Sequence, residues 1–382
     1  MASTTRVHLA LRENLPEILE FFSPVEPRVL ADGRPDPSFV HGGSGRPTLL
    51  HCALVCRNWT RPSQLALFQG AIVSHPWHAE TYRAAEDSTL QILRTLRARP
   101  DLGGAVRHLM LLYPGEDTMR EVLRRCPSVT YFFCVLPADS ARALSQIQPM
   151  TSVRRAVLHL GDPSGCLSRV LTALPNVEQL QLNALIETRN LGIPAANIVV
   201  PPRLSHLALH NQLIGWLPIF ARAELALDTL ELTLDATAVS RFRSAGFEVE
   251  DFVLAFRDTL RCLGLAGAVS TNWAKLEQCG RLQHVRTRNL RSLPHALPPR
   301  IESVEMDILS ITDPRASLSA FVSLARRTSL RKLTLYNPHD AENRQLGGAA
   351  LASWASHDAH RQQQIRGLTS QLSGVEIDIV AE

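Results

Sequence analysis

The chain has 382 residues, of which 45% are hydrophobic and 20% charged, an ordinary globular composition with room for two domains or one extended domain. Its formal net charge of +4 and the lack of any Lys/Arg run argue against a nucleic-acid partner, which needs a concentrated basic surface. The N-terminus has no basic stretch leading into a long apolar one, and no uncharged apolar run of about 18 residues follows, so we expect neither a signal peptide nor a membrane span.

The cysteines indicate a reducing compartment. They are odd in number and lack the spacing of a disulfide framework: Cys52, Cys56, Cys126, Cys134, Cys166, Cys262 and Cys279. Such a set in a long chain is typical of free thiols, so we expect a cytoplasmic and/or nuclear protein.

Two short apolar segments open the chain. LPEILEFF at 15–22 and TLLHCALVCRNWTRPSQLALF at 48–68 each have the pattern of short helices, and the Pro- and Gly-rich residues 24–47 between them predict a long flexible loop. The helices carry more apolar surface than they can cover for each other. That surplus has two interpretations, docking on a partner or capping the domain that follows.

A connecting helix is expected at 76–99, and a repeat begins near residue 100. Its pattern is apolar-x-x-apolar-x-apolar, recurring at intervals of about 20–30 residues, the period of a leucine-rich solenoid. The matching segments are 106–111, 129–134, 153–158, 177–182, 204–209, 227–232, 260–265, 282–287, 301–306, 330–335 and 372–377.

Each repeat predicts one strand followed by a helical run. Positions 1, 4 and 6 of the strand should point into the solenoid, whereas positions 2, 3 and 5 should lie on its concave face. Apolar residues at helical spacing predict helices between strands at 117–127, 164–175, 247–260 and 316–330. The expected fold is an α/β leucine-rich-repeat solenoid, a curved parallel sheet with outer helices, preceded by a small helical module.

The N-terminal segments resemble the F-box, and F-box proteins with irregular leucine-rich repeats are familiar from fungi. The resemblance rests on the Leu15–Pro16 start and on the apolar residues of 48–68. It implies an F-box-like module at 12–75 with an insertion at 24–47, a connecting helix at 76–99, and a repeat domain at 100–382. The residues that it implies for adaptor docking are Leu15, Pro16, Ile18, Leu19, Leu50, Leu54, Val55 and Trp59.

The same resemblance implies a function in the ubiquitin conjugation pathway. The chain would be a non-catalytic substrate-recognition adaptor of a Skp–cullin–F-box ligase, with a Skp-type adaptor, a cullin and a protein substrate as partners. The alternative is a repeat scaffold whose helical module is only a cap. We find no nucleotide-binding, zinc-protease or serine-hydrolase motif, and we expect no enzyme activity, cofactor, metal or membrane partner.

The concave strand positions hold the candidate substrate-binding residues: Tyr131, Phe133, Arg154, Arg155, His159, His206, His284, Arg286 and Arg288. The arginines could hold an acidic or phosphorylated segment through bidentate contacts, and the two aromatic residues could act as an anchor. The alternative is an ordinary polar sheet face exposed to water.

Lysine is scarce. Of 40 basic residues only Lys275 and Lys332 are lysine. Either codon bias explains this, or selection has removed lysines that a nearby ubiquitin-charged enzyme would modify.

Overall fold

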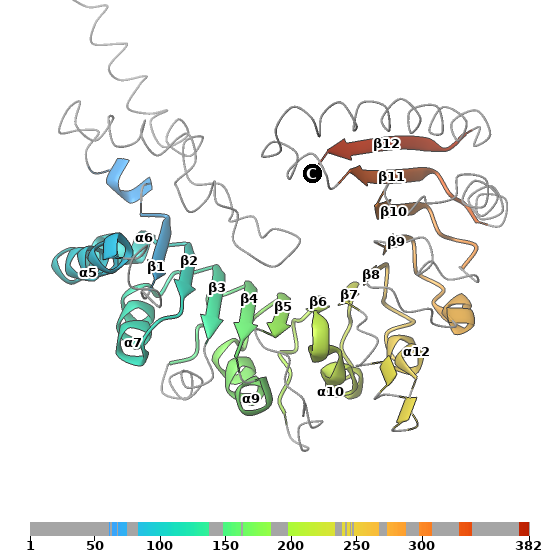
Figure 1. Ribbon diagram of the computed structural model, residues 1–382, viewed down its shortest axis with the longest axis horizontal. Coiled ribbons are helices and arrows are strands. Elements are labelled where there is room, and N and C mark those ends of the chain that lie inside the picture. Colours follow the sequence, from blue (N-terminus) through green and yellow to red (C-terminus); the bar gives the residue numbers. More distant parts are fainter. Residues whose placement is uncertain are drawn as a thin grey trace, which may run out of the picture. The chain divides into compact units, whose positions relative to one another are not determined.

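The computed structural model describes residues 61, 63–66, 68–74, 83–136, 148–161, 163–184, 198–233, 239–240, 243–244, 246, 248–266, 273–287, 298–307, 328–337 and 374–381. The chain divides into two compact units. The first contains Met1–Thr188 and Ala195–Pro202, and the second contains Arg189–Pro194 and Arg203–Glu382. Each unit is α/β, with parallel strands and helices along one side of them (Figure 1).

The described part of the first unit contains five strands that pair in sequence order. Helices α5, α7 and α9 lie along one side of these strands (Figure 1). The elements are β1 (Gly70–Ser74), α5 (Arg83–Ala98), α6 (Pro100–Ala105), β2 (His108–Leu112), α7 (Glu116–Arg125), β3 (Tyr131–Leu136), β4 (Arg155–Leu160), α9 (Pro163–Ala173) and β5 (Gln179–Ala184).

The second unit continues the same alternation, and its strands also pair in sequence order. Most of its described helices are short. The elements are β6 (His206–Leu209), η2 (Asn211–Trp216), α10 (Leu217–Arg222), β7 (Thr229–Thr233), α12 (Val249–Leu254), β8 (Cys262–Ala266), η3 (Trp273–Gln278), β9 (His284–Thr287), β10 (Ser303–Asp307), β11 (Lys332–Asn337) and β12 (Glu376–Ala381).

The strand register confirms the repeat for every predicted segment except the last. The residues at repeat position 4 are aligned across neighbouring strands. In the first unit they are Ala71, Leu109, Phe132, Ala156 and Leu180. In the second unit they are Leu207, Leu230, Leu263, Val285, Val304, Leu333 and Ile377. All but Ile377 are buried, as the predicted inward orientation of this position requires.

A shared backbone hydrogen-bond acceptor marks the start of most described repeats. The carbonyl at position 2 of one strand accepts the N–H groups of positions 2 and 3 of the next. Arg107 accepts from Thr130 at 2.8 Å and from Tyr131 at 3.0 Å, and Asp228 accepts from Arg261 and Cys262 at the same two distances. Because this bond depends on backbone geometry alone, it recurs whatever side chain occupies position 2.

The predicted last repeat at 372–377 is wrong by two residues. Ile377 pairs with Leu333, so it occupies position 4, and the repeat begins at Gly374 instead. Val375, Ile377 and Ile379 alternate along the strand, and such a pattern fits either register equally well.

The sequence analysis did not predict strand β1, which falls within the range 12–75 assigned to the helical module. Gly70 pairs with His108, and the carbonyl of Gln69 accepts the N–H groups of Arg107 and His108 at 2.8 and 2.9 Å. Phe68, Ala71 and Val73 fit the apolar repeat pattern, but they lie far ahead of the first regularly spaced segment.

Helices α7 and α9 confirm two predicted helices, because they lie within a residue or two of 117–127 and 164–175. In α7 the buried face is Met119, Val122 and Leu123, with acidic residues in the first turn and basic residues in the last, as the helix dipole favours. Helix α12 is shorter than the predicted 247–260, because the chain after Leu254 forms turns with i→i+3 bonds. Most of the predicted helix at 316–330 lies outside the described residues.

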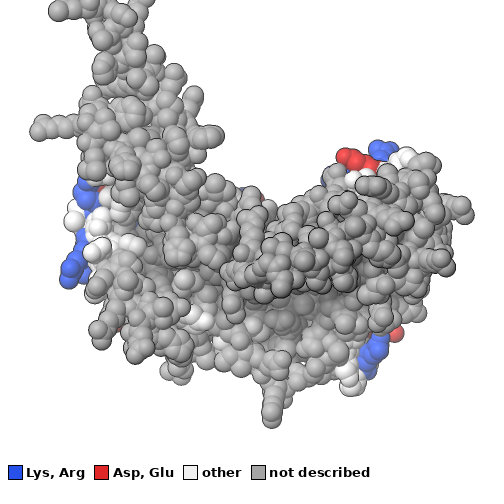
Figure 2. Space-filling view, turned by 45° about the horizontal axis from the view of Figure 1, so that its top comes forward, with Lys and Arg blue, Asp and Glu red and all other residues white. Residues whose placement is uncertain are grey.

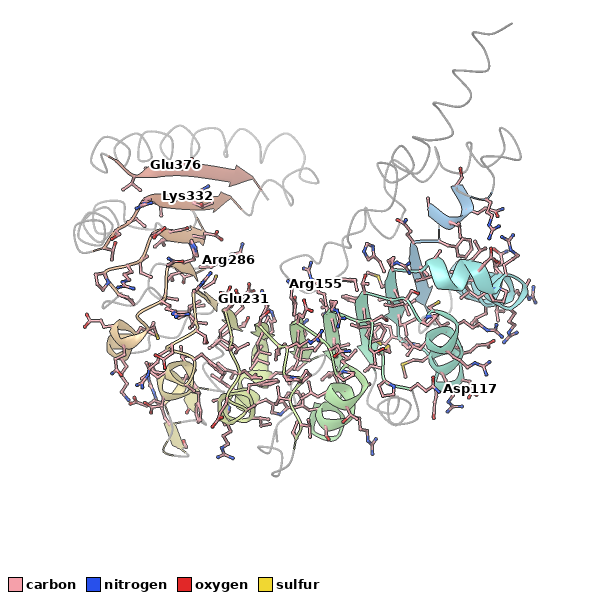
Figure 3. All side chains as sticks on the ribbon, turned by 180° about the vertical axis from the view of Figure 1, so that it is seen from behind. Asp117, Arg155, Glu231, Arg286, Lys332 and Glu376 are labelled. Carbon is pink, nitrogen blue, oxygen red and sulfur yellow. The ribbon has the colours of Figure 1, made fainter. Side chains whose placement is uncertain are left out.

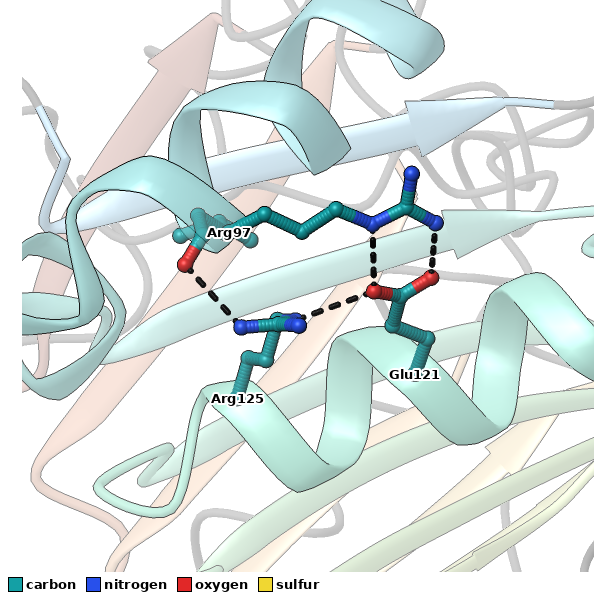
Figure 4. A network of polar contacts seen from close by, with 4 residues as sticks. Arg97, Glu121 and Arg125 are labelled. Atoms are coloured by element: carbon teal, nitrogen blue, oxygen red, sulfur yellow. Dashed lines mark hydrogen bonds and ion pairs between the residues drawn. The ribbon is translucent and has the colours of Figure 1, made fainter.

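An ion-pair network joins α5 to α7 (Figure 4). The Arg97 guanidinium donates to both carboxylate oxygens of Glu121, at 2.7 Å for Nε, and Arg125 Nε donates to the same carboxylate at 3.0 Å. Arg125 also reaches back to the carbonyl of Leu96 at 3.3 Å. The network therefore fixes one repeat's helix against the next.

Among the described helices, none combines the length and the apolarity that crossing a bilayer would need.

Candidate functional site

The strand face turned away from the helices carries the candidate binding residues. We call it the opposite face, defined by repeat positions 3, 5 and 7. In Figure 3 the labelled Arg155, Glu231 and Arg286 extend from this face, whereas Asp117 belongs to helix α7 on the other side. Position 2 lies just before each strand and borders the same face.

In the first unit the opposite face has an apolar centre. Met110, Tyr131, Phe133, Val135 and Val157 form one buried cluster, against which Leu112 packs. The two aromatic residues predicted as a substrate anchor are thus buried in the protein, with exposed fractions of 2% for Tyr131 and 0% for Phe133. An anchor for a substrate has to be reachable, so their part in binding requires this face to become accessible.

Two further predicted residues, Arg155 and His159, lie against this apolar cluster on strand β4. The guanidinium carbon of Arg155 is 5.3 Å from the centroid of the Tyr131 ring, within cation–π range. The centroid of the His159 ring lies 5.2 Å from that of the Phe133 ring. The Asn183 side-chain amide donates a hydrogen bond to His159 Nε2 at 3.2 Å. The structure therefore brings together four predicted residues from two adjacent strands.

The contacts of Arg154 mainly hold backbone turns in place. Its Nη1 donates to the carbonyl of Asn176 at 3.1 Å and to that of Thr151 at 3.4 Å, and its Nε lies 3.5 Å from the Glu178 carboxylate. Arg107 occupies the same repeat position and donates in the same way to Gly104 and Ser128. Position-2 arginines thus tie the turn of one repeat to the turn of the next.

The opposite face of the second unit is polar, and its charges are paired across strands. On β9, Arg286 Nε donates to the Glu305 carboxylate of β10 at 2.8 Å. On β6, His206 Nε2 lies 3.7 Å from Glu231 of β7, an ion pair when the imidazole is protonated. His284 is exposed on β9.

Gly264 makes room for Glu231. A Cβ on Gly264 would lie 2.9 Å from the Glu231 Cγ, so the glutamate stem occupies the space that a side chain on β8 would fill. The neighbouring Cys262 thiol has its pKa raised to about 11, chiefly by burial and further by Glu231 and Glu305. Two carboxylates, Glu231 and Glu305, therefore lie near this thiol together with Arg286.

The charge pattern bears on the predicted capture of an acidic or phosphorylated segment. Of the arginines named for it, Arg154 lies beside Glu178 and Arg286 is bonded to Glu305. Arg288 lies outside the described residues. In the view of Figure 2 the described charged side chains form small groups of both signs. An anionic ligand would thus have to compete with carboxylates already in place.

The described cysteines are free thiols: Cys126, Cys134, Cys262 and Cys279. Burial raises the pKa of Cys126 to about 12 and that of Cys279 to about 11, so both stay protonated near neutral pH. Within the described ranges, no three His, Cys, Asp or Glu residues are placed to hold a metal ion.

One of the two lysines is held by two carboxylates. Lys275 donates to Asp251 at 2.6 Å and to Glu248 at 3.0 Å, and these bonds raise the pKa of its ammonium. Its side chain joins η3 to α12, which gives it a structural role whatever the origin of the lysine scarcity.

The residues predicted for adaptor docking, from Leu15 to Trp59, all lie outside the described residues. The sequence analysis also missed the apolar residues Met110, Val135 and Val157. The signal was in YFFCVL at 131–136, a continuous apolar run typical of a strand buried on both faces. No protein-family model matches the chain, and no curated protein sequence matches it.

Proposed function

We propose that the chain is the substrate-recognition adaptor of a Skp–cullin–F-box ubiquitin ligase. Its N-terminal segments would form an F-box-like module that docks on a Skp-type adaptor, and its strands would form a leucine-rich-repeat solenoid that binds a protein substrate. It would catalyse nothing and would act in the cytoplasm and/or nucleus.

The observation that carries the proposal is the pairing of two features in one chain. Residues 15–22 and 48–68 resemble an F-box and carry more apolar surface than they can cover for each other, and a parallel strand repeat follows them. In the second unit that repeat presents exposed or half-exposed polar side chains, among them His206, His284 and Arg286. A repeat face with spaced polar groups suits protein recognition.

The mechanism would be positional. Holding a substrate on the strands while the N-terminal module holds the ligase makes the transfer to a substrate lysine effectively intramolecular. The arrangement of the chain supplies that proximity, and no side chain of this protein needs to react.

A second candidate, a scaffold whose N-terminal module is only a cap, is favoured by strand β1. Residues 70–74 were assigned to the module, yet they pair with β2 as a member of the repeat. A segment that builds the first repeat covers the end of the sheet, as a cap does.

A pull-down with purified Skp-type adaptor separates the two. The wild type is compared with a Leu15→Ala, Pro16→Ala, Leu50→Ala variant, and Leu90→Ala is the matched control because Leu90 is an apolar residue of α5 that is 45% exposed. Each leucine that docking buries contributes about 1.5–3 kcal/mol, so losing two of them should weaken docking at least about 100-fold in the triple variant.

Circular dichroism must show that all three proteins are folded. Binding by the wild type and by Leu90→Ala, without binding by the triple variant, supports the ligase role. If none of the folded proteins binds, the scaffold function replaces it. Equal binding by the triple variant would mean that these residues do not dock the adaptor.

A further inference from the structure

Glu231 lies on the opposite face of the second unit, at repeat position 5 of β7 (Figure 3). In the strand register it has Ala208 of β6 on one side and Gly264 of β8 on the other. Neither neighbour has a side chain that can donate to a carboxylate, and 29% of the Glu231 side chain is accessible. A ligand can therefore reach this carboxylate, and its two register neighbours do not compete for it.

The ion-pair partner of Glu231 differs in kind from that of a nearby carboxylate. Glu305 of β10 accepts a hydrogen bond from Arg286 at 2.8 Å, so a permanent cation matches its charge. Within the described residues Glu231 is paired only with His206, whose Nε2 lies 3.7 Å from Oε1. That distance is longer than a hydrogen bond, so the Glu231 carboxylate keeps the capacity to accept hydrogen bonds from a ligand.

Packing fixes where this carboxylate lies. A Cβ on Gly264 would be 2.9 Å from Glu231 Cγ and 3.3 Å from its Cβ, so the glutamate stem occupies the space above that glycine. A side chain that is already held in place loses less conformational entropy when it binds a ligand. The lack of a side chain on Gly264 thus prepares Glu231 for binding.

The extent to which the charge of Glu231 is matched depends on pH. An ordinary imidazole is mostly neutral above about pH 6.5 and cationic below it. Near neutral pH the described residues therefore give Glu231 no full countercharge, whereas on acidification His206 supplies one. The other titratable or charged groups of the surrounding described strands and turns are His210, Asp228, Arg261, Cys262, His284, Arg286 and Glu305. Asp228 and Glu305 each lie beside an arginine, so His206 decides whether Glu231 is neutralised.

We propose that Glu231 binds a Lys or Arg side chain of a protein substrate near neutral pH, and that protonated His206 displaces this side chain when the pH falls. A guanidinium can donate to both carboxylate oxygens at once, so arginine should bind more tightly than lysine. The proposal deepens the proposed function and rests on it, because it names a side chain by which the adaptor would recognise its substrate.

The test uses the full chain and a rhodamine-labelled peptide in which Arg alternates with Ser, followed by fluorescence anisotropy at low ionic strength. A peptide with citrulline in place of Arg is the comparison, since citrulline keeps the shape of arginine but has no charge. We expect the Arg peptide to bind at about pH 7.5 and to bind several-fold more weakly at about pH 5.5. Glu231→Gln should weaken binding roughly tenfold at the higher pH.

Two further variants separate the parts of the proposal. His206→Gln removes the competing cation, so binding should no longer weaken as the pH falls. Gly264→Ala changes no charge but displaces the Glu231 stem, so it should weaken binding, whereas Gly280→Ala, whose Cβ would meet no atom within 4 Å, should not. Asp258→Asn is the matched charge control and should leave binding unchanged, because that carboxylate is 88% accessible in the turn after α12. Circular dichroism checks that each variant is folded.

The proposal is overturned if the citrulline peptide binds as tightly as the Arg peptide, if Glu231→Gln leaves binding unchanged, or if the folded wild type binds neither peptide. The pH-dependent part is overturned if acidification weakens binding equally in the wild type and in His206→Gln, because other histidines would then be responsible. Since no Skp-type adaptor is present, the result is independent of whether the N-terminal module docks.

Discussion

Several side-chain charges in the described part of the protein meet an opposite charge from the neighbouring repeat. Arg286 bonds to Glu305, Arg154 lies near Glu178, and Arg97 holds Glu121. The sequence pattern placed Arg154 and Arg286 on the strand face. It could not show the pairing, because the partners are separated by a whole repeat. Two of the arginines predicted to hold an acidic segment, Arg154 and Arg286, therefore already lie beside carboxylates.

Glu121 gives a pH-dependent test at this scale. Its hydrogen bonds, above all that from Arg97, lower its pKa from 4.5 to about 2. A lowered folded-state pKa means that ionised Glu121 stabilises the fold fully above pH 4.5 and progressively less as the pH falls toward 2. Because Arg97 is largely exposed, we expect Glu121→Gln to cost only about 1 kcal/mol at pH 7.

Urea unfolding of the wild type and of Glu121→Gln at several pH values measures this. The difference in unfolding free energy should shrink steadily below pH 4.5. Asp258→Asn is the control, since Asp258 is exposed and 3.7 Å from Arg257. A difference that stays constant down to pH 2 would show that Glu121 acts through packing instead of charge.

At the scale of elements, the apolar pattern predicted the strands well because each strand buries the same three positions against helices. It failed where that pattern was ambiguous. Val375 and Ile377 fit two registers, and β1 lacks a regularly spaced neighbour in the sequence. Helix α12 ended early because apolar spacing predicts a helical face but not the turn that ends it.

Helix α6 can pack close to the end of α7 because Gly103 has no side chain. A Cβ on Gly103 would overlap the carbonyl oxygen of Arg125 at the end of α7, whereas a Cβ on the adjacent Gly104 would meet no atom within 4 Å. We expect Gly103→Ala to destabilise the protein by about 1–3 kcal/mol. Gly104→Ala should stabilise it by about 0.5–1 kcal/mol, because alanine favours the helix.

Chemical denaturation of the two variants compares the same substitution at neighbouring positions. The account fails here if both alanines change the stability by the same amount, because only Gly103 faces the Arg125 carbonyl.

At the scale of the whole molecule, the sequence predicted the strand–helix alternation and the mutual register of the strands from β2 to β11. The sequence placed the candidate binding residues on one strand face, but it did not predict which of them are buried. The repeat pattern places Tyr131 and Phe133 at exposed positions, whereas the continuous apolar run YFFCVL indicates a strand buried on both faces, and the packed structure shows the buried cluster. The docking residues from Leu15 to Trp59 stay a prediction that follows from the resemblance.

The division into two compact units predicts separable unfolding. Repeats contact mainly their neighbours, so a defect weakens its own unit first. Phe132 in β3 and Phe220 in α10 are both buried, at 1% and 0% exposure. Phe132→Ala and Phe220→Ala should each reduce the unfolding free energy by about 3–5 kcal/mol. In differential scanning calorimetry, each variant should lower the midpoint temperature of a different unfolding transition. A single transition, lowered equally by both, would contradict this.

Hydrogen exchange of the full chain with and without a Skp-type adaptor tests the central claim most directly, because it reports on docking and on the strands together. The account predicts new protection within residues 15–22 and 48–59, with the amides of β2 to β12 unchanged and so still available for a substrate. Protection confined to the strands, or no protection in the N-terminal residues at saturating adaptor, would contradict it.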